Sequence, residues 1–240
     1  MSIFNKNRIG ILSKKGIYKY LFYGLGEIIL VVIGILIAVN INNRNEQSAS
    51  EKRLKSYLQV YHQDMVQDTL VINSVLKYTE DRKEFFNLFL SDSVEAKHYL
   101  EKPQGLGLVL SYSPFKLQQK GISLLDNYVN DNEVEQDTLI SKILANHKAF
   151  DNLINETNTR ISEDISDNMN YLKGNEPWIA DLLLGNINNP DMLPYFLSDS
   201  YRARLAVHST LIYGNLVPIL NQLKINHIKI FEELNKRMDK

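Results

Sequence analysis

Two kinds of hydrophobic pattern divide the chain. From Leu21 to Val39 nearly every position is apolar, and only Glu27 and three glycines interrupt the run. From about Glu46 onward, apolar residues instead recur at spacings of three and four, with polar residues between them. The first pattern is typical of a helix surrounded by lipid, and the second of amphipathic helices in a bundle. The sequence therefore predicts an all-α fold, in which a single N-terminal transmembrane helix precedes an antiparallel helical bundle with long helices.

The apolar run has the length and the borders of a membrane span. Its 19 residues extend about 28 Å at 1.5 Å per residue, close to the ~30 Å hydrocarbon core of a bilayer. Aromatic residues mark one border, between Tyr18 and Tyr23, and asparagines mark the other, between Asn40 and Asn45. A cleaved signal peptide has a shorter apolar region, and the nearest small-residue site, Ser48–Ser50, lies well beyond it. We therefore expect an uncleaved signal anchor over residues 18–41.

Charge is distributed unevenly around this span. Five basic residues and no acidic ones precede Glu27, whereas 22 basic and 27 acidic residues follow it. Because Lys and Arg are retained on the cytoplasmic side of a membrane, we expect a short cytoplasmic tail over residues 1–17 and an extracytoplasmic domain over residues 42–240. In a bacterium the anchor would lie in the inner membrane and the domain in the periplasm. The acidic excess of the domain argues against nucleic acid as a partner.

Glu27 is the unusual residue of the span. At three-to-four spacing it shares one helix face with small or β-branched residues, namely Gly24, Val31, Gly34 and Ala38. Such a face permits close contact between helices in lipid, so it is our candidate membrane helix-packing face, for a second copy or for a membrane protein partner. Alternatively, the carboxyl is protonated or reaches toward the near interface. A proton relay is disfavoured because the span contains no second ionisable residue.

The domain after the span is predicted to contain three long amphipathic helices. The first covers Ser48–Ser91, as one long helix or two in close series, and the others cover Glu133–Leu172 and Ser198–Lys236. A polar turn is predicted at Asn130–Asn132, and Ser198 is the expected N-cap of the third helix. Pro218 lacks an N–H and should kink that helix near Gly214. Prolines and glycines divide residues 173–200, so this segment is predicted to be irregular.

Each long helix carries one apolar seam, which predicts its buried face. The first seam comprises Leu54, Leu58, Tyr61, Met65, Ile72 and Leu76, with Asp68 or Thr69 as its polar position. The second comprises Leu139, Ile143, His147, Phe150, Ile154, Thr157, Ile161 and Ile165. The third comprises Leu205, His208, Ile212, Leu216, Ile219, Leu223, Ile230 and Leu234.

Residue patterns that carry enzyme chemistry are missing or incomplete. The chain has no cysteine, which excludes disulfides and thiolate chemistry. A di-metal carboxylate bundle needs two Glu-x-x-His pairs, and only Glu95–His98 is present. The sequence contains no catalytic serine motif and no phosphate-binding loop in a suitable context. We therefore expect that the protein is not an enzyme and has no cofactor and no metal site.

Two groups of side chains leave alternatives open. His147 and His208 fall on the apolar seams, where a histidine is usually a satisfied core residue; ligand binding or pH sensing is the alternative. Trp178, Tyr195 and Phe196 belong to the irregular segment, where they either line a pocket or join the core.

The motifs of the chain resemble a family of uncharacterised single-pass membrane proteins of Bacteroidota-type bacteria, a domain of unknown function. The opening of that family, GEIxLVVIGILIA, matches Gly26 to Ala38 and is followed by an asparagine-rich exit ending at Glu46. A central block also resembles the family at Phe115, Gly121, Asn130–Asn132 and Leu139. Arg44 departs from the tryptophan found in many members. The resemblance implies an anchored helical protein and makes Glu27 part of a family motif, but it implies no activity.

These observations favour a membrane-anchored helical interaction or scaffold protein. An extracytoplasmic ligand-sensing domain that acts through a membrane partner is the alternative, because long helices that adjoin a span suit a sensor.

Overall fold

The computed structural model describes residues 14–132 and 137–238. These residues form helices and connecting segments without a strand, which confirms the predicted all-α class. Contacts divide the chain into two compact units, residues 1–54 and 55–240. Most of the predicted tail over residues 1–17 and the predicted start of the second long helix at Glu133 lie outside the described residues.

The first helix, α1, extends from Lys14 to Phe89 and contains 76 residues. The sequence explains its length, because neither glycine nor proline occurs between Ile35 and Lys102. The helix predicted over Ser48–Ser91 is therefore confirmed as part of α1. Residues 42–54 belong to the first compact unit, and the second unit, which we call the body, begins at Lys55.

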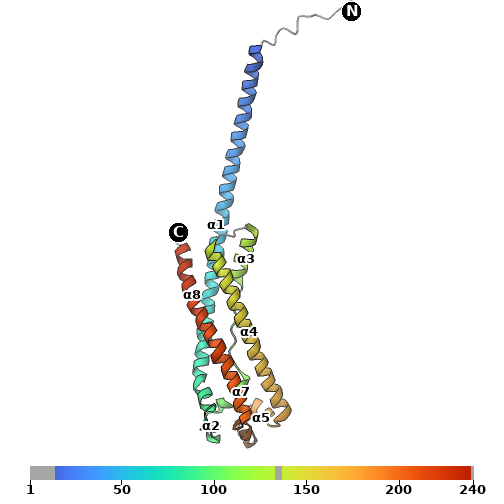
Figure 1. Ribbon diagram of the computed structural model, residues 1–240, viewed down its shortest axis with the longest axis vertical. Helices are drawn as coiled ribbons and strands as arrows, with labels where there is room; N and C mark the ends of the chain where they lie inside the picture. Colours follow the sequence, from blue (N-terminus) through green and yellow to red (C-terminus); the bar gives the residue numbers. More distant parts are fainter. Residues whose placement is uncertain (1–13, 133–136, 239–240) are drawn as a thin grey trace, which may run out of the picture. The chain divides into compact units, whose positions relative to one another are not determined.

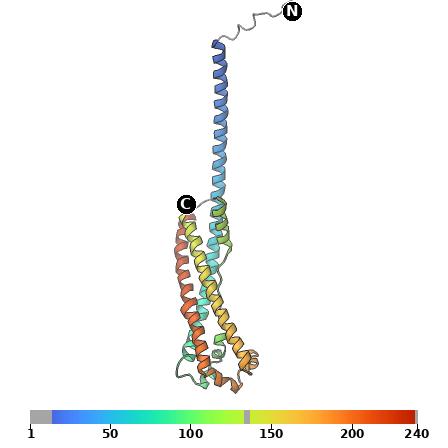
Figure 2. The ribbon, with the colours of Figure 1, turned by 45° about the vertical axis from the view of Figure 1, so that its right-hand side comes forward.

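The body, residues 55–240, is a bundle whose long helices run side by side (Figures 1 and 2). Its long members are the part of α1 from Lys55, α4 (Thr138–Asn175) and α8 (Val217–Met238). The shorter elements are α2 (Ala96–Glu101), η2 (Pro103–Leu110), α3 (Lys120–Asn132), α5 (Ile179–Leu183), η3 (Pro190–Met192), α6 (Leu193–Phe196), α7 (Asp199–Ser209) and η4 (Thr210–Leu216). Polar contacts join neighbouring helices: Lys224 of α8 donates to Asn73 of α1 at 2.8 Å.

Helix caps fix where two of these helices begin. The Asp137 side chain accepts the backbone N–H groups of Leu139 and Ile140 at 3.1 and 3.2 Å, so α4 begins at Thr138. The polar turn predicted at Asn130–Asn132 is wrong, because these residues form the end of α3. The expected N-cap at Ser198 is confirmed, since its hydroxyl accepts the N–H of Tyr201 at 3.2 Å.

Pro218 changes the helix before it into a wider π-helical turn, η4. Because proline has no N–H and its ring crowds the carbonyl of Gly214, ordinary α-helical bonding cannot continue there. The N–H of Val217 instead donates to Ile212, five residues earlier. The extra residue shifts the apolar register, so Leu220 is fully buried where the sequence pattern predicted Ile219.

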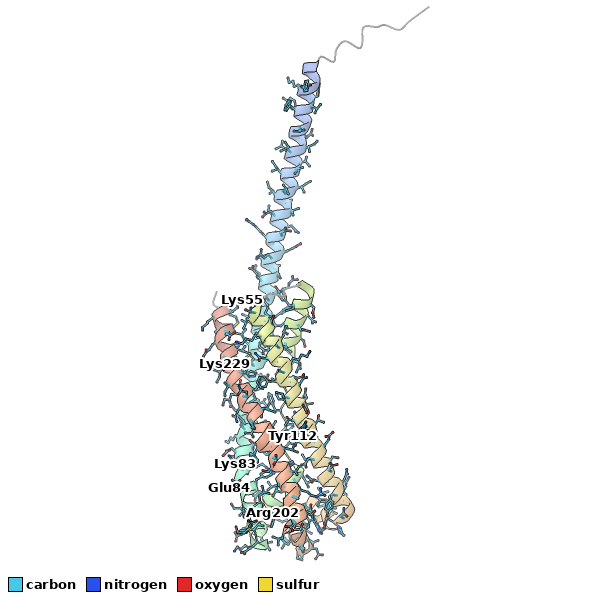
Figure 3. All side chains as sticks on the ribbon, in the orientation of Figure 1. Lys55, Lys83, Glu84, Tyr112, Arg202 and Lys229 are labelled. Atoms are coloured by element: carbon cyan, nitrogen blue, oxygen red, sulfur yellow. The ribbon has the colours of Figure 1, made fainter. Side chains whose placement is uncertain are left out.

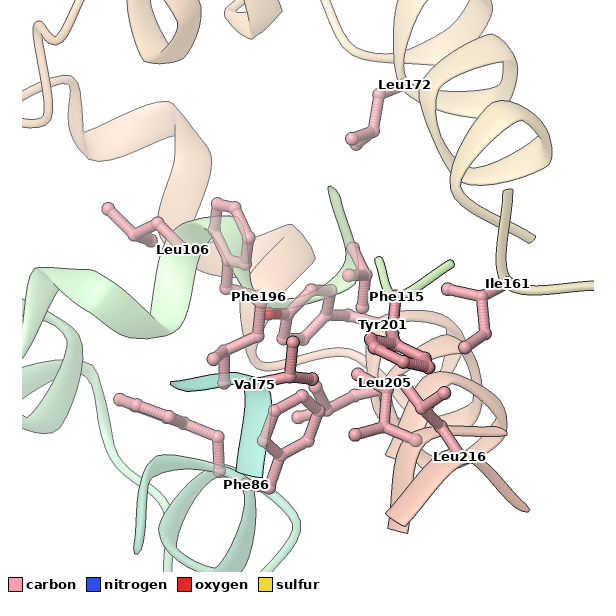
Figure 4. Packing of buried hydrophobic residues seen from close by; sticks show 14 of the residues in the cluster. Val75, Phe86, Leu106, Phe115, Ile161, Leu172, Phe196, Tyr201, Leu205 and Leu216 are labelled. Atoms are coloured by element: carbon pink, nitrogen blue, oxygen red, sulfur yellow. The ribbon is translucent and has the colours of Figure 1, made fainter. Parts of the chain in front are cut away.

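The predicted seams form the core of the body. Figure 4 shows side chains from several helices meeting in its hydrophobic cluster. The buried seam residues include Leu58, Met65, Ile72, Ile143, Ile154, Ile161, Leu205, Leu216 and Leu223. Asp68, rather than Thr69, occupies the polar position of the first seam and is 2% exposed. On α4, Phe150 is only half-buried.

Candidate functional site

The predicted helix-packing face lies entirely on α1. Its five residues fall within an arc of about 80° if each residue turns the helix by about 100°. They are Gly24, Glu27, Val31, Gly34 and Ala38. All are exposed or half-exposed, and none of the 18 residues in the most apolar window of α1 is buried. By length and composition, this is the one helix among the described residues that could cross a membrane.

Two glycines of this face differ from a packed glycine of the body. A Cβ atom added at Gly24 or Gly34 would meet nothing within 4 Å. A Cβ atom at Gly121 would lie 2.6 Å from the backbone nitrogen of Tyr61. Glycine inside a helix costs roughly 0.5–1 kcal/mol relative to alanine. Close packing within the chain explains Gly121, whereas no contact within the described structure explains Gly24 and Gly34.

Glu27 is the polar group of the face. Its side chain is exposed, and no described residue forms a hydrogen bond or an ion pair with its carboxyl. A carboxyl in an apolar environment is stabilised by a hydrogen-bonding partner or by water. The face therefore offers one hydrogen-bonding group between two positions where another backbone can approach closely.

A second polar region lies inside the body, where two aspartates of α1 bind backbone N–H groups just before and at the start of α3. Asp64 Oδ2 accepts the backbone N–H of Gly121 at 2.5 Å, and Asp68 Oδ1 accepts that of Gln118 at 3.1 Å. Burial raises the pKa of Asp68 to about 7; the hydrogen bond from Gln118 opposes this shift, and the charge of Asp64 adds to it. The two aspartates join α1 to α3.

Two buried histidines, His147 of α4 and His227 of α8, are electrostatically coupled. Burial, assisted by the neighbouring His147, lowers the pKa of His227 to about 4. Burial also lowers the pKa of His147, although Asp151 and Asp64 oppose the shift. His227 Nδ1 lies 3.4 Å from Thr69 Oγ1, whereas His147 Nε2 has no hydrogen-bond partner among the described residues. The expectation of a satisfied histidine is therefore wrong for this nitrogen of His147.

His208 of α7 contacts Asp164 of α4, and both nitrogens of its ring have a polar partner. Its Nδ1 lies 2.7 Å from Asp164 Oδ2, and its Nε2 lies 3.3 Å from the carbonyl oxygen of Ser111. The Ser111 hydroxyl instead accepts a hydrogen bond from Arg82 Nη2 at 3.1 Å. The ring is fully buried and stacks on Phe86. Both ring nitrogens have a partner, so the expected satisfied core histidine is confirmed for His208.

The remaining residues singled out in the sequence have structural roles, in a helix cap or in the core. Glu95 donates its N–H to His98 Nδ1 at 2.9 Å, so the Glu-x-x-His pair caps α2. Trp178, Tyr195 and Phe196 are buried, with ring centroids 5.4 to 5.6 Å apart, which confirms the core alternative for them. Across residues 14–132 and 137–238, no cluster of three or more His, Asp or Glu side chains is placed to hold a metal ion.

A surface groove of about 610 Å³ lies along α4. Its polar lining includes Tyr112, Asn155, Asn158, Thr159 and Ser162. The Asn158 amide donates to the carbonyl of Phe115 at 2.7 Å, while its Oδ1 is buried without a partner in the described structure. Because the Oδ1 atom is buried, it is not presented to the groove.

Residues 27–106 match a family model described as "Family of unknown function (DUF6090)". The chain is similar to this family over a third of its length. No curated protein and no solved structure matches it. The match supports the resemblance to an uncharacterised domain that the opening motif indicated. The central block that begins at Phe115 lies outside the matched residues.

The matched region covers most of the apolar span, the rest of α1 and the first short helices that follow α1. It begins at Glu27, includes the rest of α1 and α2, and ends in η2. At its end, a Cβ atom on Gly105 would lie 2.8 Å from Phe89 Cδ2, so the ring packs directly on the glycine backbone. The sequence offered Asp68 only as one of two alternatives for a polar seam position, and it gave no role to Gly105 or His227. A glycine two residues after a proline gave the only signal for Gly105, since its neighbour Phe89 cannot be inferred from the sequence.

Proposed function

We propose that this chain is a membrane-anchored interaction protein whose span pairs with another transmembrane helix. The observation that carries the proposal is the exposed face of α1, where Gly24 and Gly34 are free of contacts and Glu27 lacks a partner within the described structure. Small residues let two backbones approach in lipid, and a carboxyl can donate a hydrogen bond across the contact. The partner is a second copy or the span of another membrane protein, and lipid surrounds the remaining faces.

The orientation we propose has the N-terminus in the cytoplasm and the body in the periplasm of a bacterium. Five basic residues precede Glu27 without an acidic one, and this bias supports the assignment. Interaction is proposed rather than catalysis because the buried Asp164–His208 pair is closed by a backbone carbonyl.

Alkaline phosphatase fused after Lys240 should therefore be active, because that enzyme folds in the periplasm. A fluorescent protein that folds only in the cytoplasm should be dark at the same position. Cell fluorescence and phosphatase activity of the two fusions measure this directly. The opposite pattern would reverse the orientation.

Pairing of the span should depend on Glu27 and Gly34. Glu27→Gln keeps a hydrogen-bond donor and should retain association, whereas Glu27→Leu should weaken it by about 0.6–2 kcal/mol, the range for a hydrogen bond between helices in membranes. Gly34→Ile should also weaken it, because a branched side chain forces the backbones apart. A split reporter or crosslinking in membranes would measure association of the full chain.

The opposite side of the same helix provides matched controls. Ile29→Leu and Leu36→Ile conserve volume on a face turned about 180° away and should leave association unchanged. If Glu27→Leu and Gly34→Ile associate as strongly as the parent, the packing face is wrong. Glu27 is then better explained as an acid that reaches toward the membrane interface.

Ligand sensing through a membrane partner is the second candidate, and the groove along α4 is the observation in its favour. A small molecule that raises the melting temperature of the parent, but not of a Thr159→Val, Ser162→Ala variant of the groove, would support it.

A further inference from the structure

Three apolar side chains are exposed together at the turn after α5. Leu183 is 58% exposed, Leu184 is 85% exposed and Ile187 is 38% exposed. We name these three residues the leucine tip. Leu184 is the most exposed large apolar side chain of the described part of the body. The turn lies at the end of the body that carries α2 and Arg202, opposite the end that carries Lys55 (Figures 1 and 3).

The turn that carries the leucine tip is held in one shape. Asp181 accepts the side-chain amide of Asn189 at 2.7 Å and that of Asn186 at 3.4 Å, and its carbonyl accepts the N–H of Asn186 at 2.8 Å. Gly185 has a φ of 80°, a left-handed conformation that side chains rarely adopt. A leucine exposed on a preorganised turn loses little conformational freedom when it binds.

The flanking residues join this turn to the core. Trp178 and Ile179 before it, and Met192 after it, are buried in the main hydrophobic cluster. The core therefore holds both sides of the turn and leaves the leucine tip outside. Since these three leucine-tip side chains are not needed to fill the core, the fold itself does not explain why they are apolar.

The chain segment that carries the leucine tip is acidic. Between Gly174 and Ser200 the chain has four acidic residues and no basic one. The acidic residues are Glu176, Asp181, Asp191 and Asp199. Of the basic side chains of neighbouring elements, Arg202 pairs with Asp92 at 2.6 Å and Lys97 pairs with Glu95 at 2.9 Å, while Arg204 donates to Asn168 and stacks on Tyr171. Lys173, in the last turn of α4, precedes the segment.

We propose that the leucine tip is a docking surface for another protein, which offers an apolar pocket bordered by Lys and Arg side chains. The exposed leucines supply apolar area, and the acidic border supplies charge complementarity to a basic rim. An anionic bilayer is a poor occupant because the same acids would repel it. This surface is separate from the span, so the proposal goes beyond helix pairing and does not depend on it.

A photoreactive phenylalanine analogue placed at position 184 of the full-length, membrane-anchored protein tests this in the native host. The matched control carries the analogue at Asn152, an exposed position on α4. We expect a discrete adduct with another protein at position 184 and none at position 152. No protein adduct, an adduct with a second copy, or an adduct with lipid alone would each overturn the proposal.

The captured protein, once purified, should bind the full chain in detergent with an affinity that falls as salt rises. Leu184→Ser and Leu183→Ser should each weaken binding at least about tenfold, as central apolar contacts do, and Leu184→Met should retain it. Asp191→Asn should reduce the salt dependence. All four variants should melt at the temperature of the parent, because these side chains are exposed. Unchanged affinity in both serine variants would overturn the proposal.

Discussion

Replacing Gly121 by alanine should lower the free energy of unfolding by about 2–3 kcal/mol, at the upper end of what overpacking costs. The added Cβ would lie 2.6 Å from the backbone nitrogen of Tyr61, so α3 and α1 would have to separate. That movement would also lengthen the bond from the Gly121 N–H to Asp64. At roughly 2–4 °C per kcal/mol for a chain of this size, the melting temperature should fall by roughly 5–10 °C.

Gly174 provides the control for this substitution. It lies in the last turns of α4, and a Cβ atom there would meet nothing within 4 Å. Gly174→Ala should therefore raise stability by roughly 0.5–1 kcal/mol, because alanine is the better helix former. Thermal unfolding of the full chain in detergent, followed by circular dichroism, measures both variants. A Gly121→Ala protein that melts with the parent would show that α1 and α3 do not pack this closely.

The same glycine shows what periodicity can and cannot predict. The spacing of apolar residues located the three long helices and most of their buried faces, because a helix that is buried on one face carries apolar residues at spacings of three and four. It did not reveal which helix crosses which, so the role of Gly121 was hidden until Tyr61 was placed against it.

Helix ends were less predictable than helix faces. The sequence suggested a turn at Asn130–Asn132, but the cap that decides the start of α4 is Asp137, whose side chain accepts two backbone N–H groups. Pro218 was expected to kink its helix near Gly214; what the structure shows there is a π-helical turn that shifts the buried register to Leu220. Local hydrogen bonding determines both outcomes, and apolar spacing does not report it.

Helical spacing alone places the five residues of the candidate face on one side of α1, and that this side packs against another helix stays a prediction. The interior polar region could not be predicted, since a buried aspartate such as Asp68 is recognisable only when its partner is known. That partner, the N–H of Gln118, lies 50 residues away in the chain. For a polar residue on an apolar seam, the structure is therefore needed to identify the hydrogen-bond partner.

Asp68→Asn should stabilise the protein at pH 8 and change little at pH 4. The folded-state pKa of Asp68 is raised from 3.8 to about 7, mainly by burial. Between these values the folded state binds more protons than the unfolded state, so the stability of the parent falls as pH rises from about 4 to 7 and stays lower above 7. Asparagine carries no charge and can still accept the Gln118 N–H. We expect a gain of about 2–4 kcal/mol at pH 8.

Thermal unfolding of parent and variant between pH 4 and pH 9 would show this as curves that diverge as pH rises. The exposed Asp167 supplies the control, since Asp167→Asn should follow the parent throughout. His227 acts in the opposite direction: its pKa is lowered from 6.5 to about 4, so stability is lost as pH falls through that interval. Both proteins keep this histidine and should lose stability together on the acid side. A stability difference that is equal at pH 4 and pH 8 would mean that Asp68 is not held neutral by burial.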